Sequence, residues 1–184
     1  MTRNSYQILN ILPANETLLE KEVYLIVINA AHIPPHLALS VNGKLFTLTV
    51  KGATVDGALT SLIRLVKKRS IETIFIKLSI PQLFTLDQLK EEIRKHTLAY
   101  PRVDVNIGTC LNPIKDFCST VYETEIKNVN FLFDLLPKLY DQKIITSCYH
   151  LNLDKYLDNN SFCLNRYNMN DIYEGIRNSQ LTVA

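Results

Sequence analysis

Apolar residues along the chain are grouped in short runs that predict β-strands. Residues 22–29 (EVYLIVIN) form such a run, β-branched and apolar on both faces, as expected for a strand buried between two layers. Residues 72–80 (ETIFIKLSI) have the same character, and residues 103–107 and 143–151 predict two further strands. The pattern therefore indicates a sheet that draws on most of the chain.

The strongest local pattern is a β-hairpin over residues 36–50 (HLALSVNGKLFTLTV). Two alternating runs flank Asn42-Gly43, a pair that favours the two-residue turn of a hairpin. Such a turn fixes the register and creates one apolar face, with Val41 opposite Lys44, Leu39 opposite Phe46, and Leu37 opposite Leu48. The other face pairs Ser40 with Leu45, Ala38 with Thr47, and His36 with Thr49. This second face is small and polar, and its imidazole would point at whatever packs above it.

Helices are predicted between the strands from caps and apolar spacing. Asp56 can cap one helix, and Thr85 with Gln88 forms the capping box of another. The expected helices reach from residue 56 to about 69, 85 to 98, 112 to 121 and 170 to 177, while residues 130–140 are apolar but interrupted by Pro137. Strands and helices interleave without regular βαβ spacing. The sequence therefore indicates an α+β fold, with a central, mainly antiparallel sheet and helices packed on it.

Composition limits the classes of function. A length of 184 residues, 47% of them hydrophobic and 21% charged, suits one globular domain over residues 1–184. The formal net charge of +2 gives no electrostatic reason to expect nucleic acid or an anionic membrane as partner. The first residues lack the apolar core of a signal peptide, and the longest apolar run, Val23 to Ile28, is too short to cross a bilayer. These features predict a cytoplasmic protein.

The cysteines supply the most reactive side chains. They stand at positions 110, 118, 148 and 163, match no zinc motif, and are expected to be free thiols. Cys110 follows a predicted strand and comes directly before a short predicted helix. The unpaired N–H groups and dipole of that helix would lower the pKa of the thiol, and a neighbouring imidazole would complete a nucleophilic thiolate. A small buried core residue is the alternative role for Cys110.

The order of these segments resembles the circularly permuted papain-like hydrolases of the NlpC type. In that family a strand with the catalytic histidine, in an HxGIxVG-like stretch, precedes the helix with the nucleophilic cysteine. Residues 36–43 (HLALSVNG) are similar to the first stretch, and residues 108–111 (GTCL) stand where the family has its YYCSEL-like segment. Residues 133–137 (FDLLP) are similar to its PDDLL-like segment. Ala38 departs from the family pattern, which has glycine there.

The resemblance covers residues 22–152 and leaves residues 153–184 as a C-terminal extension. It implies a permuted papain-like architecture and a thiol-dependent hydrolase, either an amidase or peptidase or an acyl-ester hydrolase. Cys110 would be the nucleophile, His36 the general base, and Thr49 the residue that orients the imidazole, with the hydroxyl of Thr47 as the other candidate. The expected substrate is a small peptide, a cell-wall fragment or an acyl conjugate, and no cofactor is expected.

Two other functions compete with hydrolysis. A catalytically inactive binding or scaffold domain could use the same fold. A metal site could use His32, His36 and a cysteine, but Pro34 and Pro35 exclude the helix on which HxxxH spacing brings two imidazoles together. Neither a GxGxxG nor a Walker A pattern occurs, so the sequence does not support dinucleotide or phosphate binding.

Overall fold

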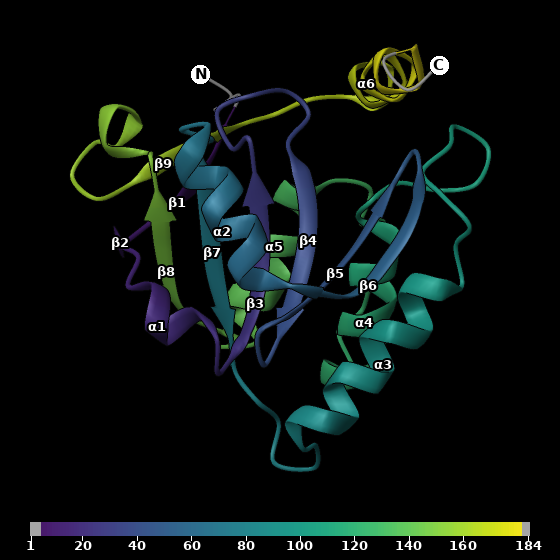
Figure 1. The fold of residues 1–184 in the computed structure, drawn as a ribbon, viewed down its shortest axis with the longest axis horizontal. Helices are drawn as coiled ribbons and strands as arrows, with labels where there is room; N and C mark the ends of the chain where they lie inside the picture. The colour runs from purple at the N-terminus through teal and green to yellow at the C-terminus, as the bar shows by residue number, and fades with distance from the viewer. Residues whose placement is uncertain (1–4, 182–184) are drawn as a thin grey trace.

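The computed structural model describes residues 5–181, in which short strands and helices follow one another (Figure 1). The strands are β1 (Ser5–Ile8), β2 (Ile11–Pro13), β3 (Val23–Ile28), β4 (His36–Val41), β5 (Lys44–Thr49), β6 (Gly52–Ala58), β7 (Thr73–Leu78), β8 (Ile145–Leu151) and β9 (Phe162–Asn165). The helices are α1 (Glu16–Leu19), α2 (Leu59–Lys68), α3 (Leu86–Leu98), α4 (Asn112–Tyr122), α5 (Leu132–Asp141) and α6 (Met169–Leu181), with a 3-10 turn η1 (Asp154–Tyr156).

Seven strands form one sheet in the order β2-β8-β7-β3-β4-β5-β6. Neighbours in this sheet run antiparallel, except that β2 and β8 are parallel. The strands β1 and β9 form a separate, two-stranded antiparallel sheet. The α+β class and the mainly antiparallel central sheet expected from the sequence are therefore confirmed.

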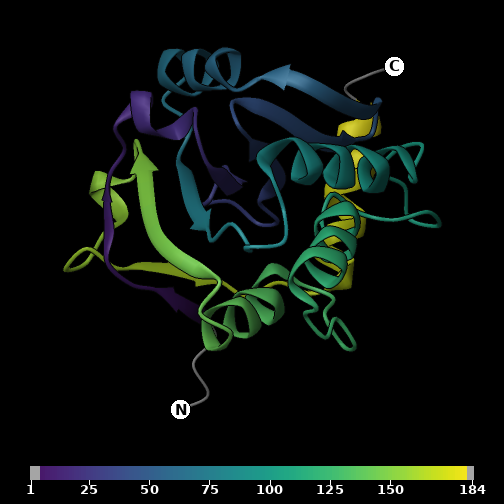
Figure 2. The ribbon, with the colours of Figure 1, turned by 90° about the horizontal axis from the view of Figure 1, so that it is seen from below.

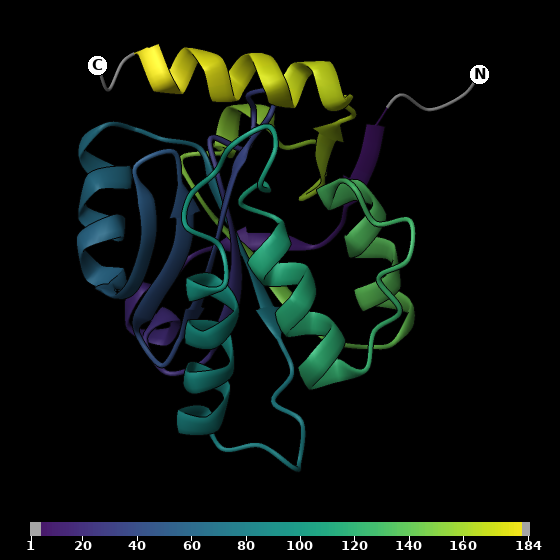
Figure 3. The ribbon, with the colours of Figure 1, turned by 90° about the vertical axis from the view of Figure 1, so that its right-hand side faces the viewer.

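Helices cover both faces of the large sheet (Figure 2). On one face Leu25 and Ile76 are buried in the larger hydrophobic core with residues of α3, α4 and α5. On the other face Tyr24 and Phe75 are buried with residues of α1 and α2. The central strands β3 and β7 are thus apolar on both sides, which explains their continuous apolar runs. Helix α6 lies outside these layers, across the ends of the strands (Figure 3).

The β4–β5 hairpin has the turn that its sequence predicts. Asn42 and Gly43 have φ values of 48° and 73°, as a type I′ turn requires. The ladder runs from this turn as far as the pair Ala38 and Thr47. Beyond that pair β4 and β5 no longer pair with each other, although β4 stays paired with β3 and β5 with β6, so the expected pair of His36 with a β5 residue is not part of the ladder. The two strands therefore separate at the end of the sheet that carries His36.

The segment before α2 differs from the sequence prediction, which used Asp56 as a helix cap. Residues 52–58 form the edge strand β6, and α2 begins at Leu59 without a side-chain cap. The carboxylate of Asp56 binds the guanidinium of Arg94 on α3, with Nε–Oδ2 and Nη2–Oδ1 distances of 3.0 and 2.6 Å. This ion pair joins α3 to the sheet edge through residues far apart in the sequence, so local spacing did not indicate it.

Two later segments also differ from the prediction. Residues 103–107 form a turn closed by a bridge between Asp104 and Gly108, and not a strand. Pro137 does not interrupt its segment, because α5 continues through it and buries its apolar face in the core. Burial of that face compensates for the intrahelical hydrogen bond that proline cannot donate. The capping box of Thr85 is confirmed, since both of its hydrogen bonds are present.

The hairpin turn provides a test of the fold. Gly43 has a φ of +73°, and a Cβ there would lie 3.3 Å from the backbone oxygen of Glu20. Gly43→Ala is expected to lower the free energy of unfolding, measured by urea denaturation, by about 1–2 kcal/mol. Gly57→Ala is the matched control, because its Cβ would meet atoms only at ordinary contact distances from 3.4 Å. Equal destabilisation by the two substitutions would contradict the turn described above.

Candidate active site

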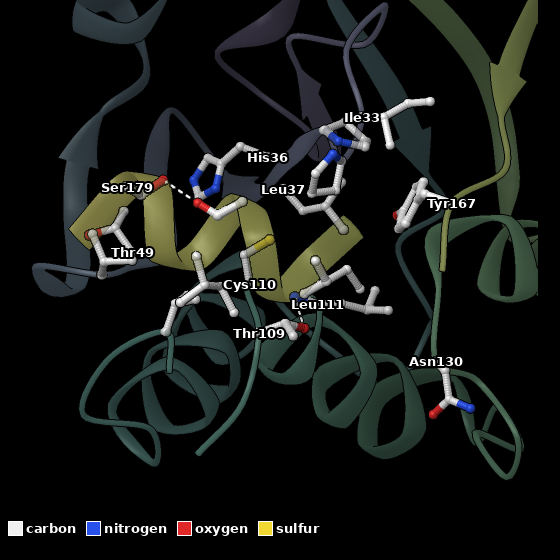
Figure 4. Close-up of a pocket in the computed structure, with 17 residues that line it drawn as sticks. Ile33, His36, Leu37, Thr49, Thr109, Cys110, Leu111, Asn130, Tyr167 and Ser179 are labelled. Carbon is white, nitrogen blue, oxygen red and sulfur yellow. Dashed lines mark hydrogen bonds between the residues drawn. The ribbon is translucent and has the colours of Figure 1, made fainter. Parts of the chain in front are cut away.

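A cavity of about 380 Å³ lies at the end of the sheet where β4 and β5 separate. Its walls come mainly from residues 33–37, the end of β5, the turn before α4, and α6. His36 and Cys110, which are far apart in the sequence, both line this cavity beside α6 (Figure 4). The structure thus brings together the two residues that the sequence proposes as base and nucleophile.

The two side chains reach the cavity from different faces of the hairpin. His36 shares its face with Thr47, whereas Cys110 packs with the apolar core on the other face, next to Leu37. A continuous sheet would keep two such groups apart. They share a cavity here because it lies at the end of the sheet, beyond the last pair of the β4–β5 ladder.

Cys110 lies in the tight turn that leads into α4, and not in the helix itself. Helix α4 begins at Asn112, whose Oδ1 accepts hydrogen bonds of 3.0 Å from both the N–H and the hydroxyl of Thr109. The N–H of Leu111 donates to the Thr109 hydroxyl at 3.2 Å, and the N–H of Asn112 donates to the Thr109 carbonyl at 3.1 Å. Within the described part of the chain, the N–H of Cys110 is the backbone donor of this turn that has no oxygen acceptor, and it lies near its own sulfur.

The thiol of Cys110 does not have the lowered pKa that its place before a helix predicts. Burial raises the pKa to about 11. The backbone N–H groups of Leu37 and of Cys110 itself face the sulfur and act in the opposite direction, but their effect is smaller. The expectation of a lowered pKa is therefore wrong, because desolvation of the thiolate outweighs the nearby N–H groups.

The imidazole of His36 is held by Thr47 on the neighbouring strand. Its Nε2 lies 2.8 Å from Oγ1 of Thr47, and this hydroxyl lies 3.1 Å from the carbonyl oxygen of Leu37, to which it donates. A hydroxyl has one proton, so Thr47 accepts from Nε2–H and the unprotonated nitrogen of a neutral His36 is Nδ1. No group among residues 5–181 hydrogen-bonds to Nδ1. The network therefore fixes the tautomer and leaves a basic nitrogen available.

Thr49, which the sequence places opposite His36, has other partners. Its hydroxyl donates to the carbonyl of Gly52 at 3.1 Å and accepts from the N–H of Lys51 at 3.2 Å, which closes the turn between β5 and β6. Thr49 still lines the cavity. In this arrangement the hydroxyl that contacts the imidazole is that of Thr47, the other candidate of the sequence analysis.

Burial also affects the charge of the histidine. It lowers the pKa of His36 to about 4, because the protonated imidazole would lose its hydration. At neutral pH the imidazole and the Cys110 thiol are both uncharged. No hydrogen bond between the two side chains occurs in the part of the chain that the structure describes. The resting site is therefore a neutral thiol and a neutral base, and not an ion pair.

Helix α6 forms one wall of the cavity with a single face. Ile172, Gly175, Ile176 and Ser179 follow three- and four-residue spacing and all line it. Gly175 lets the helix lie against Pro34, because a Cβ at this position would be only 3.2 Å from Cδ of the proline ring. The loop before β4 and the C-terminal helix are thus in direct contact above the site.

Tyr167 is a wall residue that the sequence did not indicate. It lies between β9 and α6, is buried, and packs edge-on against Phe131 and Phe133 with ring centroids 5.5 and 5.2 Å apart. Burial raises the pKa of its hydroxyl well above the ordinary value, so the side chain is uncharged. The helix expected over residues 170–177 is present as α6. No local pattern links this C-terminal segment to the hairpin, and the sequence analysis therefore missed Tyr167 and the position of α6 at the cavity.

The remaining candidate residues lie elsewhere. All four cysteines are free, with Cys118 and Cys148 buried in the core and Cys163 exposed. His32 lies near Glu72 and does not line the cavity. Among residues 5–181 no three His, Cys, Asp or Glu side chains are grouped so as to hold a metal ion. Over the same residues, every helix is too short or too polar to cross a bilayer.

Comparisons with known proteins do not add to this picture. The chain matches no family model, no curated protein and no solved structure. The chemistry of the site therefore follows from its own geometry, which places one thiol, one unprotonated imidazole nitrogen and one backbone N–H without an oxygen acceptor at a largely apolar cavity.

Thr47 can be tested as the partner of the imidazole. Thr47→Val removes the acceptor of Nε2–H, so we expect the Nε2–H tautomer to lose population and the free energy of unfolding to fall by about 1–3 kcal/mol. Long-range ¹H–¹⁵N NMR at pH 7 reports the tautomer, and urea denaturation the stability. Thr49→Val is the matched control and should leave the tautomer unchanged. If the tautomer population changes only in Thr49→Val, then Thr49, and not Thr47, is the hydrogen-bond partner of the imidazole.

The buried imidazole predicts acid sensitivity. The folded-state pKa of His36, about 4, lies below the ordinary value of 6.5, so the unfolded chain binds this proton more tightly. The stability contributed by neutral His36 is complete above pH 6.5 and is lost as the pH falls toward 4. Wild type should lose about 2 kcal/mol more than His36→Gln between pH 7 and pH 5 in urea denaturation. The same loss in both proteins would show that His36 is not desolvated.

Proposed function

We propose that this protein is a thiol-dependent hydrolase of amides or esters, with Cys110 as nucleophile and His36 as general base. One observation carries the proposal: a free thiol and an imidazole of fixed tautomer line the same cavity. Since Thr47 engages Nε2, the nitrogen left to accept a proton is Nδ1. A cysteine that only filled space in the core would not need an imidazole in the same cavity.

The neutral resting state determines how the thiolate forms. Sγ of Cys110 attacks the substrate carbonyl carbon while its proton passes to Nδ1 of His36, so the charged pair exists only during the reaction. The imidazolium then protonates the leaving amine or alcohol, and a thioester on Cys110 remains. Water attacks this thioester with His36 again as base, which releases the acid and restores the thiol. Thr47 acts as a positioning residue that keeps Nδ1 available.

Backbone N–H groups supply the electrostatic support. The N–H of Cys110 has no oxygen acceptor among the described residues and can donate to the oxyanion that develops on the carbonyl. The N–H of Leu37 faces the sulfur and stabilises negative charge there as the proton leaves. The open end of the β4–β5 ladder thus provides the space and the N–H of Leu37, and the turn before α4 provides the N–H of Cys110.

The permuted papain-like architecture is part of the same proposal. The strand with His36 precedes the helix that Cys110 leads into, and the hydroxyl that orients the imidazole comes from the adjacent strand β5. This order supports a relationship to the NlpC-type hydrolases over residues 22–152. The extension 153–184 adds the α6 wall. Small peptides, cell-wall fragments and acyl conjugates are the substrate classes considered, and the mechanism above requires no cofactor.

The reaction is tested with p-nitrophenyl acetate. We expect burst release of p-nitrophenol, an acetyl group on the peptide that contains Cys110, and continued turnover. Cys110→Ala and His36→Ala should each lower the turnover rate by about 100-fold or more, and Thr47→Ala by about tenfold. Cys163→Ala is the control, because Cys163 is an exposed thiol outside the cavity. Acylation confined to Cys163, or turnover unchanged in His36→Ala, would contradict the proposal.

A ligand-binding domain without catalysis is the second candidate. The observation that favours it is the uncharged pair, since a thiol with a pKa of about 11 and an imidazole with a pKa of about 4 form no resting ion pair. The same assay separates the candidates. A catalyst turns over the ester and depends on both side chains, whereas a binding domain shows neither acylation of Cys110 nor turnover.

A further inference from the structure

We infer that the cavity selects an uncharged, apolar acyl group of medium length, an inference that rests on the proposed hydrolase. Among the described residues that line the cavity there is no Asp, Glu, Lys or Arg. Most of the wall consists of aliphatic side chains and proline rings, including Ile33, Leu37, Val50, Val103, Leu111 and Ile176. The substrate classes left open by the mechanism are therefore not equivalent.

Charge is the first criterion of selection. A carboxylate or ammonium group that entered this cavity would lose its hydration and find no side chain of opposite charge on the wall. The site already disfavours charge on its own groups, since His36 and Cys110 are held in their neutral forms. Peptides and cell-wall fragments whose ionised ends lie near the reacting bond are disfavoured for the same reason. A hydrocarbon chain has no favourable hydration to lose when it enters the cavity, and it gains contact with the aliphatic wall.

Shape is the second criterion. The α6 face that lines the cavity extends from Ile172 to Ser179, seven positions, which corresponds to about 10 Å of helix. Cys110 lies beside the middle of this wall, with His36 toward the Ser179 end and Tyr167 toward the other (Figure 4). A space of about 380 Å³ with mostly apolar sides, beside a helix wall of this length, suits an extended chain of roughly six to ten carbons.

The reaction is then the transfer of this acyl group to the thiol and from the thiol to water. The Cys110 Sγ–H bond and the bond from the carbonyl carbon to the leaving oxygen or sulfur break, and the Sγ–carbonyl bond forms. The proton moves to Nδ1 of His36 and on to the leaving group. Water cleaves the thioester in the second half, so the products are a free carboxylic acid and an alcohol or thiol. The acid is ionised at neutral pH, and the uncharged wall favours its release.

Chain length provides the direct test. The probes are p-nitrophenyl esters from acetyl to dodecanoyl, with the rate of Cys110→Ala subtracted. We expect kcat/KM to rise about fourfold per methylene up to about octanoyl, the ratio that corresponds to about 0.8 kcal/mol per buried methylene. The mono-p-nitrophenyl ester of suberic acid has the length of the octanoyl ester with a terminal carboxylate. It should react about 100-fold more slowly, because the carboxylate would be desolvated.

A cavity-filling substitution gives a matched pair of variants. Val50 lines the cavity, so Val50→Phe should abolish the advantage of octanoyl over acetyl, measured as the ratio of the two kcat/KM values. Leu65 lies partly exposed on α2 and does not line the cavity, so Leu65→Phe should keep the full chain-length dependence. Circular dichroism and urea denaturation are used to check that both variants are folded.

Calorimetric titration with octanamide separates this inference from the hydrolase proposal, because an amide of a simple acid tests the pocket without the need for turnover. Turnover with no dependence on chain length or charge would overturn the inference and leave the hydrolase standing. Binding of octanamide that Val50→Phe abolishes, without any turnover, would support the selectivity and overturn the hydrolase. If octanamide does not bind and the rate does not depend on chain length, the inferred selectivity is overturned, whatever the rate with p-nitrophenyl acetate.

Discussion

The site depends on one interruption of the sheet, at the pair Ala38 and Thr47. Up to this pair β4 and β5 exchange ladder hydrogen bonds, and beyond it they separate. The Thr47 hydroxyl takes the place of the missing ladder partner by donating to the Leu37 carbonyl. The same oxygen then accepts from His36, and the thiol of Cys110 faces the N–H of Leu37. A ladder continued to the end of both strands would leave no room for this arrangement.

The electrostatics of the site are governed by burial more than by the helix beside it. A helix N-terminus favours a thiolate, but α4 starts two residues after Cys110 and its first turn is occupied by the hydrogen bonds of Thr109 and Asn112. Desolvation is the larger effect on the thiol and the whole effect on the imidazole. The free thiol and the imidazole are therefore both uncharged at neutral pH, and in the proposed reaction charge would develop only after a substrate has bound.

Local sequence patterns predicted those parts of the fold that local interactions determine. The Asn42-Gly43 turn, the capping box at Thr85 and the buried strands around residues 23–28 and 73–78 are of this kind. The predictions failed where a residue far away in the sequence determines the local structure. The residues around Asp56 are compatible with a helix cap, but in the folded protein its carboxylate binds Arg94 on α3 and the segment is an edge strand.

The candidate site shows the same division. The sequence patterns of the hairpin and of the turn before α4 identified His36 and Cys110. The point at which the β4–β5 ladder ends is a property of the assembled sheet, and it makes Thr47, and not Thr49, the partner of the imidazole. The role of α6 was not predictable, since its sequence shows an apolar stripe but not the surface that the stripe covers. Gly175 becomes meaningful only when Pro34 is seen beside it.

The way α6 is held has a consequence for motion. Only Ile172 and Ile176 of this helix are buried, and no ion pair joins it to the rest of residues 5–181. The two isoleucines contribute about 3–6 kcal/mol of burial, and Met169 and Tyr173 add partly buried contacts, which together is much less than the sheet and its two helical layers. Helix α6 therefore opens by local unfolding well before the domain unfolds, and its amides exchange with solvent at a lower free energy than those of β3 or β7. We therefore expect the α6 wall to be the part of the cavity that moves most easily, while the strands that carry His36 and Thr47 stay in place.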